Sequence, residues 1–361
     1  MTHIIESSKM PPKKPVGIRE LARLSGISIG TVSRALNNRR GVNAATRARV
    51  LDQARRFGYV PNNAARTLKD QTILNVGLLL APFVSLNKEI NPVTLRFIDL
   101  FGQRVADLNM SLRVIVFTNQ EELKNLVTAN HTDVVVFCGE FPETSYGMIH
   151  ELGIPAVLMS HHSDLDDQVS VLVDTSLPGE RAIEYLAALG HERIGLVTGP
   201  RGTLHVDGYF EGFMKGLHEF GLPWHKEWTI ELAPSKSNKE GAAEALLPIL
   251  RQRNRPTALV FSSDWMALGG YQAACDLKLR VPQDLSIIGH DNMPATSELT
   301  PPLTTFEVNP PKFVKLLAEL AKDLGNRQWN SESLSKREIL LSSDFVKRES
   351  CFCARRRSLG T

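Results

Sequence analysis

The stretch from Ile18 to Leu36, IRELARLSGISIGTVSRAL, constrains the fold of this 361-residue chain more than any other. Its first apolar residues recur every three or four positions, the spacing of a helix with one buried face. They are Ile18, Leu21, Ala22 and Leu24. A short helix is therefore expected at the start of the stretch.

A second helix is predicted directly after a turn at Gly26, because glycine readily adopts the positive φ that a tight turn needs. Ser28 is placed as its N-cap, and Val32, Ala35 and Leu36 would face inward. Two short helices joined in this way form a helix-turn-helix unit, whose second helix can lie in the major groove of DNA. The outward residues are Ile29, Gly30, Ser33, Arg34 and Asn37.

Charge separates this stretch from an ordinary helical hairpin on a protein surface. Residues 1–69 hold 14 Lys and Arg against three acids, a net charge of +11, whereas the remainder carries −8. Such segregation indicates a polyanion-binding head on an acidic body. The coincidence of the basic segment with the helix-turn-helix pattern favours DNA binding.

The bulk composition is that of a globular protein, with 42% hydrophobic and 22% charged residues. We find no run of about 18 apolar residues that could span a membrane. Residues 1–16 lack the apolar segment of a secretory signal and are expected to form a disordered lead. The four cysteines show no zinc-type spacing, so we expect no metal and a reducing, cytoplasmic location.

A third helix is predicted from Ala44 to Phe57, capped by Asn43. Its inward face would carry Val50, Leu51 and Ala54 together with Phe57. The segment 62–69 that follows is too short to hold a helix alone in water. It would order only against DNA or a second copy of itself.

From residue 73 onward, apolar strand-like runs alternate with amphipathic stretches, which predicts parallel sheets with helices on both faces. The expected strands are 74–80, 112–117, 133–138, 156–159, 169–173, 193–197, 229–232, 258–261 and 285–288. The expected helices are 93–108, 123–130, 178–189, 209–220, 239–252, 265–277 and 311–324.

Six motifs in this chain resemble the LacI/GalR family of bacterial transcriptional regulators, in the family's order and over roughly residues 17–350. They are VSRALNN at 32–38, TRARVLDQARRFGYVPNNAARTL at 46–68, ILNVGLLLAP at 73–82, GHERIGLVTGP at 190–200, the stretch from RPTALVF to IIGHDN at 255–292, and LTPPLTT at 299–305.

The resemblance implies a fold of α plus α/β type. An N-terminal helix-turn-helix head with a hinge helix would precede two doubly wound α/β subdomains of periplasmic-binding-protein type, with three chain crossings between them. The implied boundaries are 1–16 for the lead, 17–61 for the DNA-binding domain, 62–72 for the hinge helix and linker, 73–350 for the interleaved effector-binding and dimerisation domain, and 351–361 for a basic tail.

The resemblance also implies which residues meet DNA. Ile29 and Gly30 match the pair that sets operator identity; isoleucine can only make apolar contact, and glycine offers no side chain. Arg34 is then the candidate for a bidentate contact to guanine. Leu68 matches the hinge leucine that kinks the operator centre through the minor groove. The full implied set is Ile18, Ser28, Ile29, Gly30, Thr31, Ser33, Arg34, Asn37, Asn43, Tyr59, Asn62, Ala65 and Leu68.

The effector site is expected where strands end, because ligands in open α/β sheets bind at their carboxyl ends. Asp174 and Asp291 match effector contacts of the family. Two departures are notable: Tyr209 stands where the family has a sugar-binding arginine, and Ser263-Asp264 replaces its Asn-Asp pair. Loss of a bidentate donor makes an acidic effector improbable and favours a neutral saccharide stacked on an aromatic ring. The candidate residues are Phe83, Asn91, Ser160, Asp174, Tyr209, Ser263, Asp264, Trp265 and Asp291.

No enzyme signature is found: the sequence lacks a P-loop, a GxSxG elbow, HExxH and a dinucleotide fingerprint. His161 and His162, with Asp164, Asp166 and Asp167, could suggest a metal cluster, but their crowding without helical spacing favours a solvated loop. We therefore expect no catalytic residues, no cofactor and no metal.

Together these features predict a homodimeric transcriptional regulator, a repressor, that binds double-stranded, pseudo-palindromic operator DNA and responds to a small effector, a neutral sugar. The target would be a carbohydrate-utilisation operon. Two alternatives from the same fold are a nucleoside and an amino-acid derivative as effector. A soluble saccharide-binding protein and an enzyme of carbohydrate metabolism are the rivals from other classes.

Overall fold

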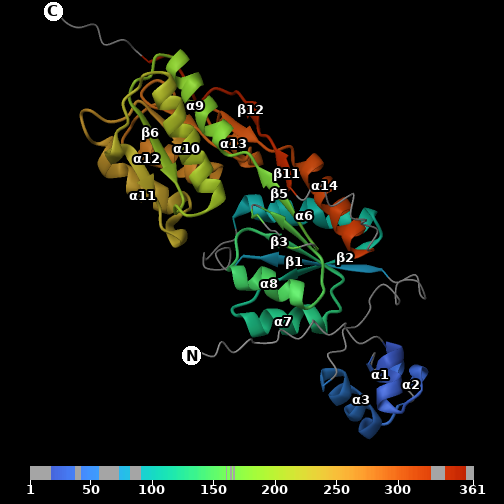
Figure 1. Ribbon diagram of the computed structural model, residues 1–361. Helices are drawn as coiled ribbons and strands as arrows, with labels where there is room; N and C mark the ends of the chain where they lie inside the picture. The colour runs from blue at the N-terminus through green and yellow to red at the C-terminus, as the bar shows by residue number, and fades with distance from the viewer. Residues whose placement is uncertain are drawn as a thin grey trace, which may run out of the picture. The chain divides into compact units, whose positions relative to one another are not determined.

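The computed structural model describes residues 18–36, 42–56, 73–81, 91–159, 161–162, 165, 167–326 and 338–354. The chain divides into two compact units, residues 1–72 and residues 73–361, which are described separately below. We refer to them as the head and the body (Figure 1).

The head contains three helices around a small apolar core: α1 (Ile18–Ser25), α2 (Ile29–Leu36) and α3 (Ala44–Arg56). Two residues expected inside are not: Leu24 is 37% exposed and Leu51 39% exposed. Both lie on the helix sides that face away from the shared core. That core consists of Leu21, Ala22, Val32, Ala35, Val50 and Ala54.

The turn chemistry of the head is as predicted. Gly26 has φ +63°, and Ser28 caps α2 by accepting the Thr31 N–H at 3.2 Å. Asn43 caps α3 in the same way, accepting the Thr46 N–H at 2.7 Å. Each cap satisfies one of the backbone donors that the first turn of a helix leaves free.

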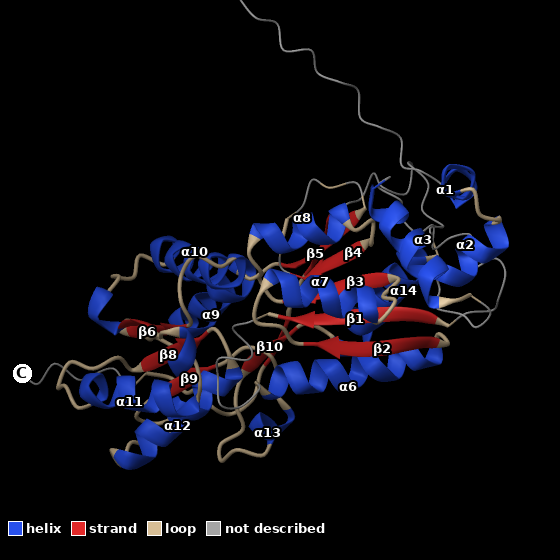
Figure 2. Cartoon of the chain, turned by 90° about the horizontal axis from the view of Figure 1, so that it is seen from below, coloured by secondary structure: helices blue, strands red, loops and turns tan. Residues whose placement is uncertain are grey.

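The first sheet of the body is parallel throughout its described strands, in the order β11-β5-β4-β3-β1-β2. Helices separate most of these strands along the chain and cover both faces of the sheet (Figure 2). In chain order the elements are β1 (Leu74–Leu80), α6 (Pro92–Asp107), β2 (Met110–Ile115), α7 (Gln120–Ala129), β3 (Val134–Cys138), α8 (Glu143–Glu151), β4 (Ala156–Met159), β5 (Gln168–Val173), α14 (Pro310–Gly325) and β11 (Glu338–Leu341).

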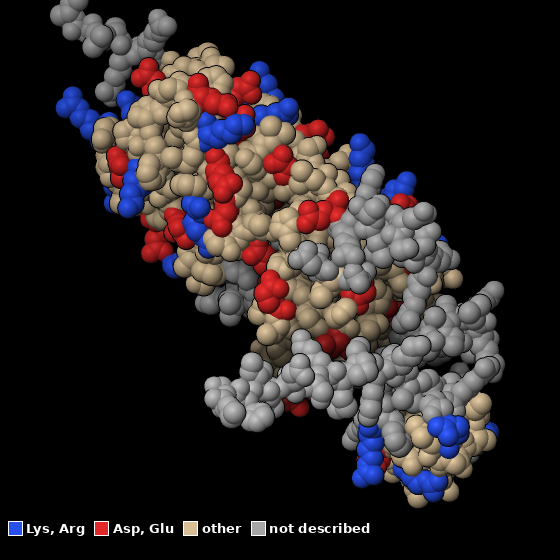
Figure 3. All heavy atoms as spheres, in the orientation of Figure 1, with Lys and Arg blue, Asp and Glu red and all other residues tan. Residues whose placement is uncertain are grey.

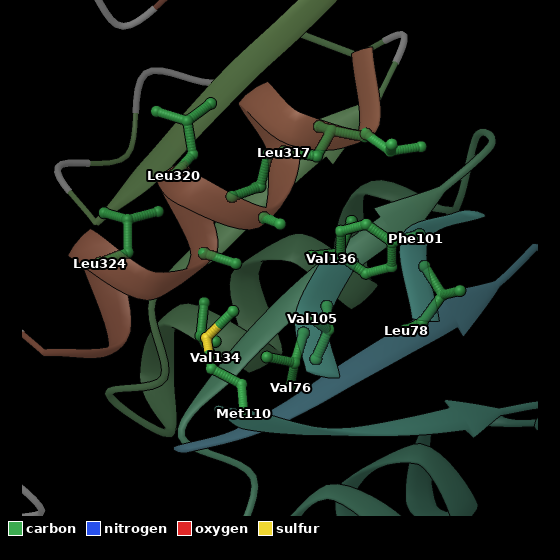
Figure 4. Packing of buried hydrophobic residues seen from close by; sticks show 14 of the residues in the cluster. Val76, Leu78, Phe101, Val105, Met110, Val134, Val136, Leu317, Leu320 and Leu324 are labelled. Carbon is green, nitrogen blue, oxygen red and sulfur yellow. The ribbon is translucent and has the colours of Figure 1, made fainter. Parts of the chain in front are cut away.

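Alternate residues of the central strands point into two different cores, because side chains along a strand alternate between faces. Val76 and Leu78 of β1 pack with Phe101 of α6 and Leu317 of α14 on one face (Figure 4). Leu79 packs with residues of α7 and α8 on the other. Burial on both faces explains why these strands read as continuous apolar runs.

The second sheet is also parallel in its described strands, in the order β7-β6-β8-β9. Helices α9 and α10 pack on one face, and α11 and α12 on the other. The elements are α9 (Ser176–Ala188), β6 (Ile194–Thr198), α10 (Leu204–Glu219), the 3-10 helix η1 (Lys226–Trp228), β7 (Thr229–Glu231), the 3-10 helix η2 (Pro234–Lys236), α11 (Lys239–Leu250), β8 (Ala258–Phe261), α12 (Asp264–Asp276), β9 (Ser286–Ile288) and α13 (Pro294–Ser297).

Within the described residues the chain passes between the two sheets three times, as the resemblance implied. It leaves the first sheet after β5, returns to it with α14, and leaves again after β11. The last crossing pairs β12 (Asp344–Val346) with β10 (Thr305–Glu307) in an antiparallel ladder. The alternating strands and helices predicted from sequence are confirmed, whereas α8, α13, β10, β11 and β12 were not predicted.

Among the described helices, none is both long and apolar enough to cross a lipid bilayer.

Candidate DNA-binding face and effector site

Helix α2 presents a small, largely polar face to solvent. Ile29 is 48% exposed, and Gly30 and Arg34 are exposed beside it, while Val32 and Ala35 are buried. A helix that enters a major groove needs one apolar side that packs on its own domain and one accessible side of small residues that meets the bases. The structure therefore confirms the orientation predicted for these residues.

Arg34 lies back along its own helix. Its Nε donates a hydrogen bond to the Gly30 carbonyl at 3.2 Å. A Cβ at position 30 would lie 3.9 Å from the nearer Arg34 nitrogen, which is ordinary van der Waals contact. The guanidinium is thus held over the surface that Gly30 leaves open, with its other N–H groups available to a base edge.

Basic side chains outnumber acidic ones on the visible described surface of the head (Figure 3). Arg23, Arg34, Arg49 and Arg56 are exposed, against Asp52, which pairs with Arg56 at 3.4 Å. Exposed arginines at this density suit contacts to DNA phosphates. Such contacts position a protein along the duplex but do not read the base sequence.

The remaining predicted DNA contacts are placed as follows. Asn43 is exposed and caps α3, and Thr31 is half-buried at the start of α2. The backbones of Ile18 and Ser33 belong to α1 and α2. Outside the described residues lie Asn37, Tyr59, Asn62, Ala65 and Leu68.

In the body, two predicted acids meet because β8 and β9 are parallel neighbours and end at the same edge of the sheet. Asp264 follows β8, and Asp291 follows β9. The Asp264 N–H donates to the His290 carbonyl at 2.6 Å and approaches Asp291 Oδ2 at 3.4 Å.

Asp264 uses its carboxylate oxygens within the protein, a role that the sequence did not predict. Its side chain is fully buried. Oδ1 accepts the Thr305 hydroxyl at 2.7 Å, while Oδ2 accepts the Met293 N–H at 2.8 Å and the Thr296 hydroxyl at 3.3 Å. The Asp264 carboxylate thus links the start of α12 to Met293, to Thr296 of α13 and to Thr305 of β10.

Tyr209 is also placed differently from the prediction. Its ring is fully buried, 5.5 Å from the His290 ring and 6.5 Å from the His205 ring, so it offers no face for stacking. Its hydroxyl, however, has no hydrogen-bond partner among the described residues. His290 Nδ1 is buried without a partner as well. Buried polar atoms without a partner are uncommon in folded proteins, so these two set the surroundings of Asp291 apart from most of the interior.

The other predicted effector residues have local roles. Asn91 caps α6 by accepting the Val93 N–H at 2.9 Å, and Ser263 caps α12 by accepting the Met266 N–H at 3.3 Å. Asp174 Oδ1 accepts two N–H groups at the start of α9, at 3.0 Å each. Trp265 is 7% exposed and contributes to the interior instead of a ligand surface. Phe83 and Ser160 lie outside the described residues.

Several residues at this edge were not singled out from the sequence. His290 precedes Asp291 directly, and His205 lies one helical turn before Tyr209, so both could have been found from those neighbours. Among the described residues, two hydrogen bonds connect the half of the body built on the first sheet with the half built on the second. The Leu204 N–H donates to Glu140 Oε1 at 2.8 Å, and Arg96 Nη1 donates to the Asn292 carbonyl at 3.1 Å. No local sequence pattern predicts contacts between residues this far apart in the chain.

Of the histidines and acids after β4, Asp164 and Asp166 lie outside the described residues, and the other three make side-chain contacts. His161 stacks flat on Tyr146, with 4.1 Å between ring centroids, and pairs with Glu143 at 3.1 Å. His162 pairs with Glu338, and Asp167 with His150. Across the part of the chain that the structure describes, no three His, Cys, Asp or Glu side chains gather as metal ligands.

Comparison with known proteins agrees with this architecture. Residues 17–62 match the model of the lacI family of bacterial regulatory proteins, and residues 183–351 match that of a periplasmic-binding-protein-like domain. The HTH-type transcriptional repressor PurR of Photorhabdus laumondii is 31% identical over 295 residues, 80% of this chain and 84% of its own length. PurR of Actinobacillus pleuropneumoniae is 30% identical, with 80% and 84% covered.

Solved structures share the fold at lower identity. The lac repressor dimer bound to operator and the anti-inducer ONPF is 22% identical, with a TM-score of 0.66 over 94% of this chain and 100% of that one. The complex of the transcriptional regulator CelR with cellobiose is 20% identical, with a TM-score of 0.65 over 92% and 99%.

Proposed function

The chain belongs to the LacI family of bacterial regulatory proteins, and from this premise we propose that it represses a carbohydrate-utilisation operon under the control of a neutral saccharide. At the level of the family it is a ligand-responsive, DNA-binding transcriptional repressor without enzymatic activity. The operator sequence and the effector class belong to the proposal.

The exposed face of α2 is the observation that supports operator recognition. Ile29 provides methyl groups for the C5-methyl of thymine, and Arg34 provides a planar donor pair for guanine O6 and N7. Gly30, which follows Ile29 on the same helix, presents no side chain to the groove. We propose that two such heads, in a homodimer, read the two halves of a pseudo-palindromic operator.

The charges around Asp291 favour an uncharged effector. The unpartnered groups beside it, Tyr209 Oη and His290 Nδ1, are uncharged, and the two nearby guanidiniums of Arg96 and Arg348 bond to Asn292. Burial lowers the pKa of His290 to about 3, so that its ring is neutral. Uncharged polar groups and carboxyls suit hydroxyl groups, and a negatively charged carboxylate repels phosphates or carboxylates.

A purine-type effector is the second candidate, because the PurR repressors are the curated relatives at 30–31% identity. A nucleobase also presents ring nitrogens and carbonyl oxygens that hydroxyl and carboxyl groups can bond.

Two measurements test the proposal. Fluorescence anisotropy with the DNA upstream of its own gene is expected to show affinity that falls steeply with salt, since each phosphate contact releases counterions. Affinity that stays flat between low and moderate salt contradicts operator binding. Thermal-shift titrations with cellobiose, ribose, adenine and adenosine then separate the effector classes, because bound ligand raises the transition by an amount that grows with RT ln(1 + [L]/Kd). A shift with adenine and none with either sugar overturns the saccharide assignment.

A further inference from the structure

The two carboxyls at the ends of β8 and β9 are supported unequally. Asp264 receives three hydrogen bonds, from the Thr305 hydroxyl, the Met293 N–H and the Thr296 hydroxyl. Donors of this kind stabilise a carboxylate over the neutral acid. Ionising Asp264 therefore costs less free energy than ionising Asp291.

Asp291 lacks such support. Among the described residues, the one hydrogen-bond donor within reach of its carboxyl is the Asp264 N–H, at the long distance of 3.4 Å. Its backbone has φ +115°, a region that favours glycine, and its N–H donates to the Phe306 carbonyl at 2.8 Å. A residue held in such a conformation is one whose placement the surrounding structure enforces. Its half-buried carboxyl lies beside the start of α12, where Asp291 Oδ2 is 3.4 Å from the Asp264 nitrogen.

The groups that face the pair supply little positive charge. From α10 come His205, whose Nε2 bonds the Ser262 carbonyl at 3.3 Å, and Tyr209; from the β9 loop comes His290. Burial lowers the pKa of both histidines, so they stay neutral. The Arg348 guanidinium bonds the Leu303 carbonyl at 2.8 Å and Asn292 Oδ1 at 2.5 Å.

A second cation near the loop, Arg96 of α6, bonds the Asn292 carbonyl. Both guanidiniums are therefore engaged next to Asp291 and not by its carboxyl. Burial raises the pKa of Asp264 to about 7, while burial first and the Asp264 charge second raise the pKa of Asp291 well above its ordinary value. These directions agree with the geometry, which favours one negative charge on the pair.

We propose that Asp291 keeps its carboxyl proton at neutral pH and meets the effector as a neutral hydrogen-bond donor, with Asp264 carrying the single negative charge of the pair. This rests on the proposed function, because it concerns the same effector site. The donors at the site are then the Asp291 carboxyl and the Tyr209 hydroxyl. They select an uncharged acceptor, such as a hydroxyl, ether or carbonyl oxygen, and the charge on Asp264 repels anions.

The sign of the linkage gives a test that needs no effector. When the pKa of a carboxyl is higher in the folded than in the unfolded protein, unfolding releases a proton. Asp291 should therefore lower the free energy of unfolding by an amount that grows as pH rises from about 4 towards its folded-state pKa. Asp291→Asn removes this cost. The urea unfolding constant of the wild type, divided by that of Asp291→Asn, should rise with pH over this window, by up to about tenfold per unit.

The unfolding of the body can be followed by tryptophan fluorescence in the full-length protein, because Trp224, Trp228, Trp265 and Trp329 all lie beyond residue 73. Asp276→Asn, at an exposed site on α12, is the matched control and should show the same pH dependence as the wild type. A ratio for Asp291→Asn that is constant from pH 5 to about 8, or that falls as pH rises, overturns the proposal.

Infrared spectroscopy provides an independent measurement should the variant fold poorly. At neutral pH, the wild-type spectrum minus that of Asp291→Asn should contain the carbonyl stretch of a protonated carboxylic acid, and this band should vanish at alkaline pH. A carboxylate band in its place at neutral pH refutes the proposal. Either result leaves operator binding untouched, so a failure here is distinct from a failure of the proposed function.

Discussion

Leu21→Ala provides a sharp test of the division into head and body. Leu21 is fully buried in a core with Val32 and Val50 as its other larger side chains. Removing a buried leucine side chain typically costs about 2–5 kcal/mol. The three-helix part of the head, from Ile18 to Arg56, spans about 40 residues. At about 0.05–0.15 kcal/mol per residue, its stability is roughly 2–6 kcal/mol. The substitution therefore removes most of the free energy that keeps the head folded.

The expected result is a selective loss of DNA binding. Operator affinity of the full-length variant should drop and become strongly temperature-dependent, because only the folded fraction of heads can bind. Unfolding of the body, followed by tryptophan fluorescence, should be unchanged, since the four tryptophans lie in residues 73–361.

Leu24→Ala is the matched control on the same helix. Leu24 is 37% exposed, so its truncation should cost far less and leave operator binding close to that of the wild type. If Leu21→Ala and Leu24→Ala weaken binding equally, or if Leu21→Ala shifts the body transition, the assignment of separate cores to head and body is wrong.

Two further substitutions probe other parts of the structure. Arg34→Ala should cost about 1–3 kcal/mol on operator DNA and little on random DNA in salt-matched anisotropy titrations; equal losses on both would show that Arg34 is a phosphate contact. Gly212→Ala should destabilise the body in urea by about 1–3 kcal/mol, because its Cβ would lie 1.8 Å from the Ser176 carbonyl oxygen. The matched Gly147→Ala on α8 meets nothing within 4 Å and should be neutral or stabilising, so similar losses at both positions would argue against close α9–α10 packing.

The elements that sequence predicts are those whose patterns are local. The strand at Leu74–Leu80 is a continuous apolar run because both of its faces are buried, and its bounds agree with the prediction. In contrast, β10 and β12 are three residues each and exist through the pairing of Thr305 with Val346, some 40 positions apart. β11 alternates exposed and half-buried residues at a sheet edge, so it lacks the apolar run that marked the central strands.

The effector site shows the same limit. Position at a strand end correctly brought Asp264 and Asp291 together, because parallel neighbouring strands end at one edge. Their different roles depend on which donors arrive from elsewhere in the chain. The hydroxyl that bonds Asp264 Oδ1 comes from Thr305, more than 40 residues away. Residue type alone assigns both aspartates to the ligand, whereas the structure buries Asp264 completely.

Asn292 connects the proposed effector site to the half of the body built on the first sheet. Arg348 bonds the Asn292 side chain, and Arg96 of α6 bonds its carbonyl from the half that follows the head in sequence. Under the proposed function, a ligand-induced movement of Asp291 would act on α6 through the hydrogen bond between Asn292 and Arg96. Arg96→Met should therefore preserve ligand affinity but reduce the ligand-induced change in operator affinity, a coupling that is typically about 1–3 kcal/mol. Arg251→Met, on the exposed end of α11, is the control, and full coupling in Arg96→Met would rule out this route.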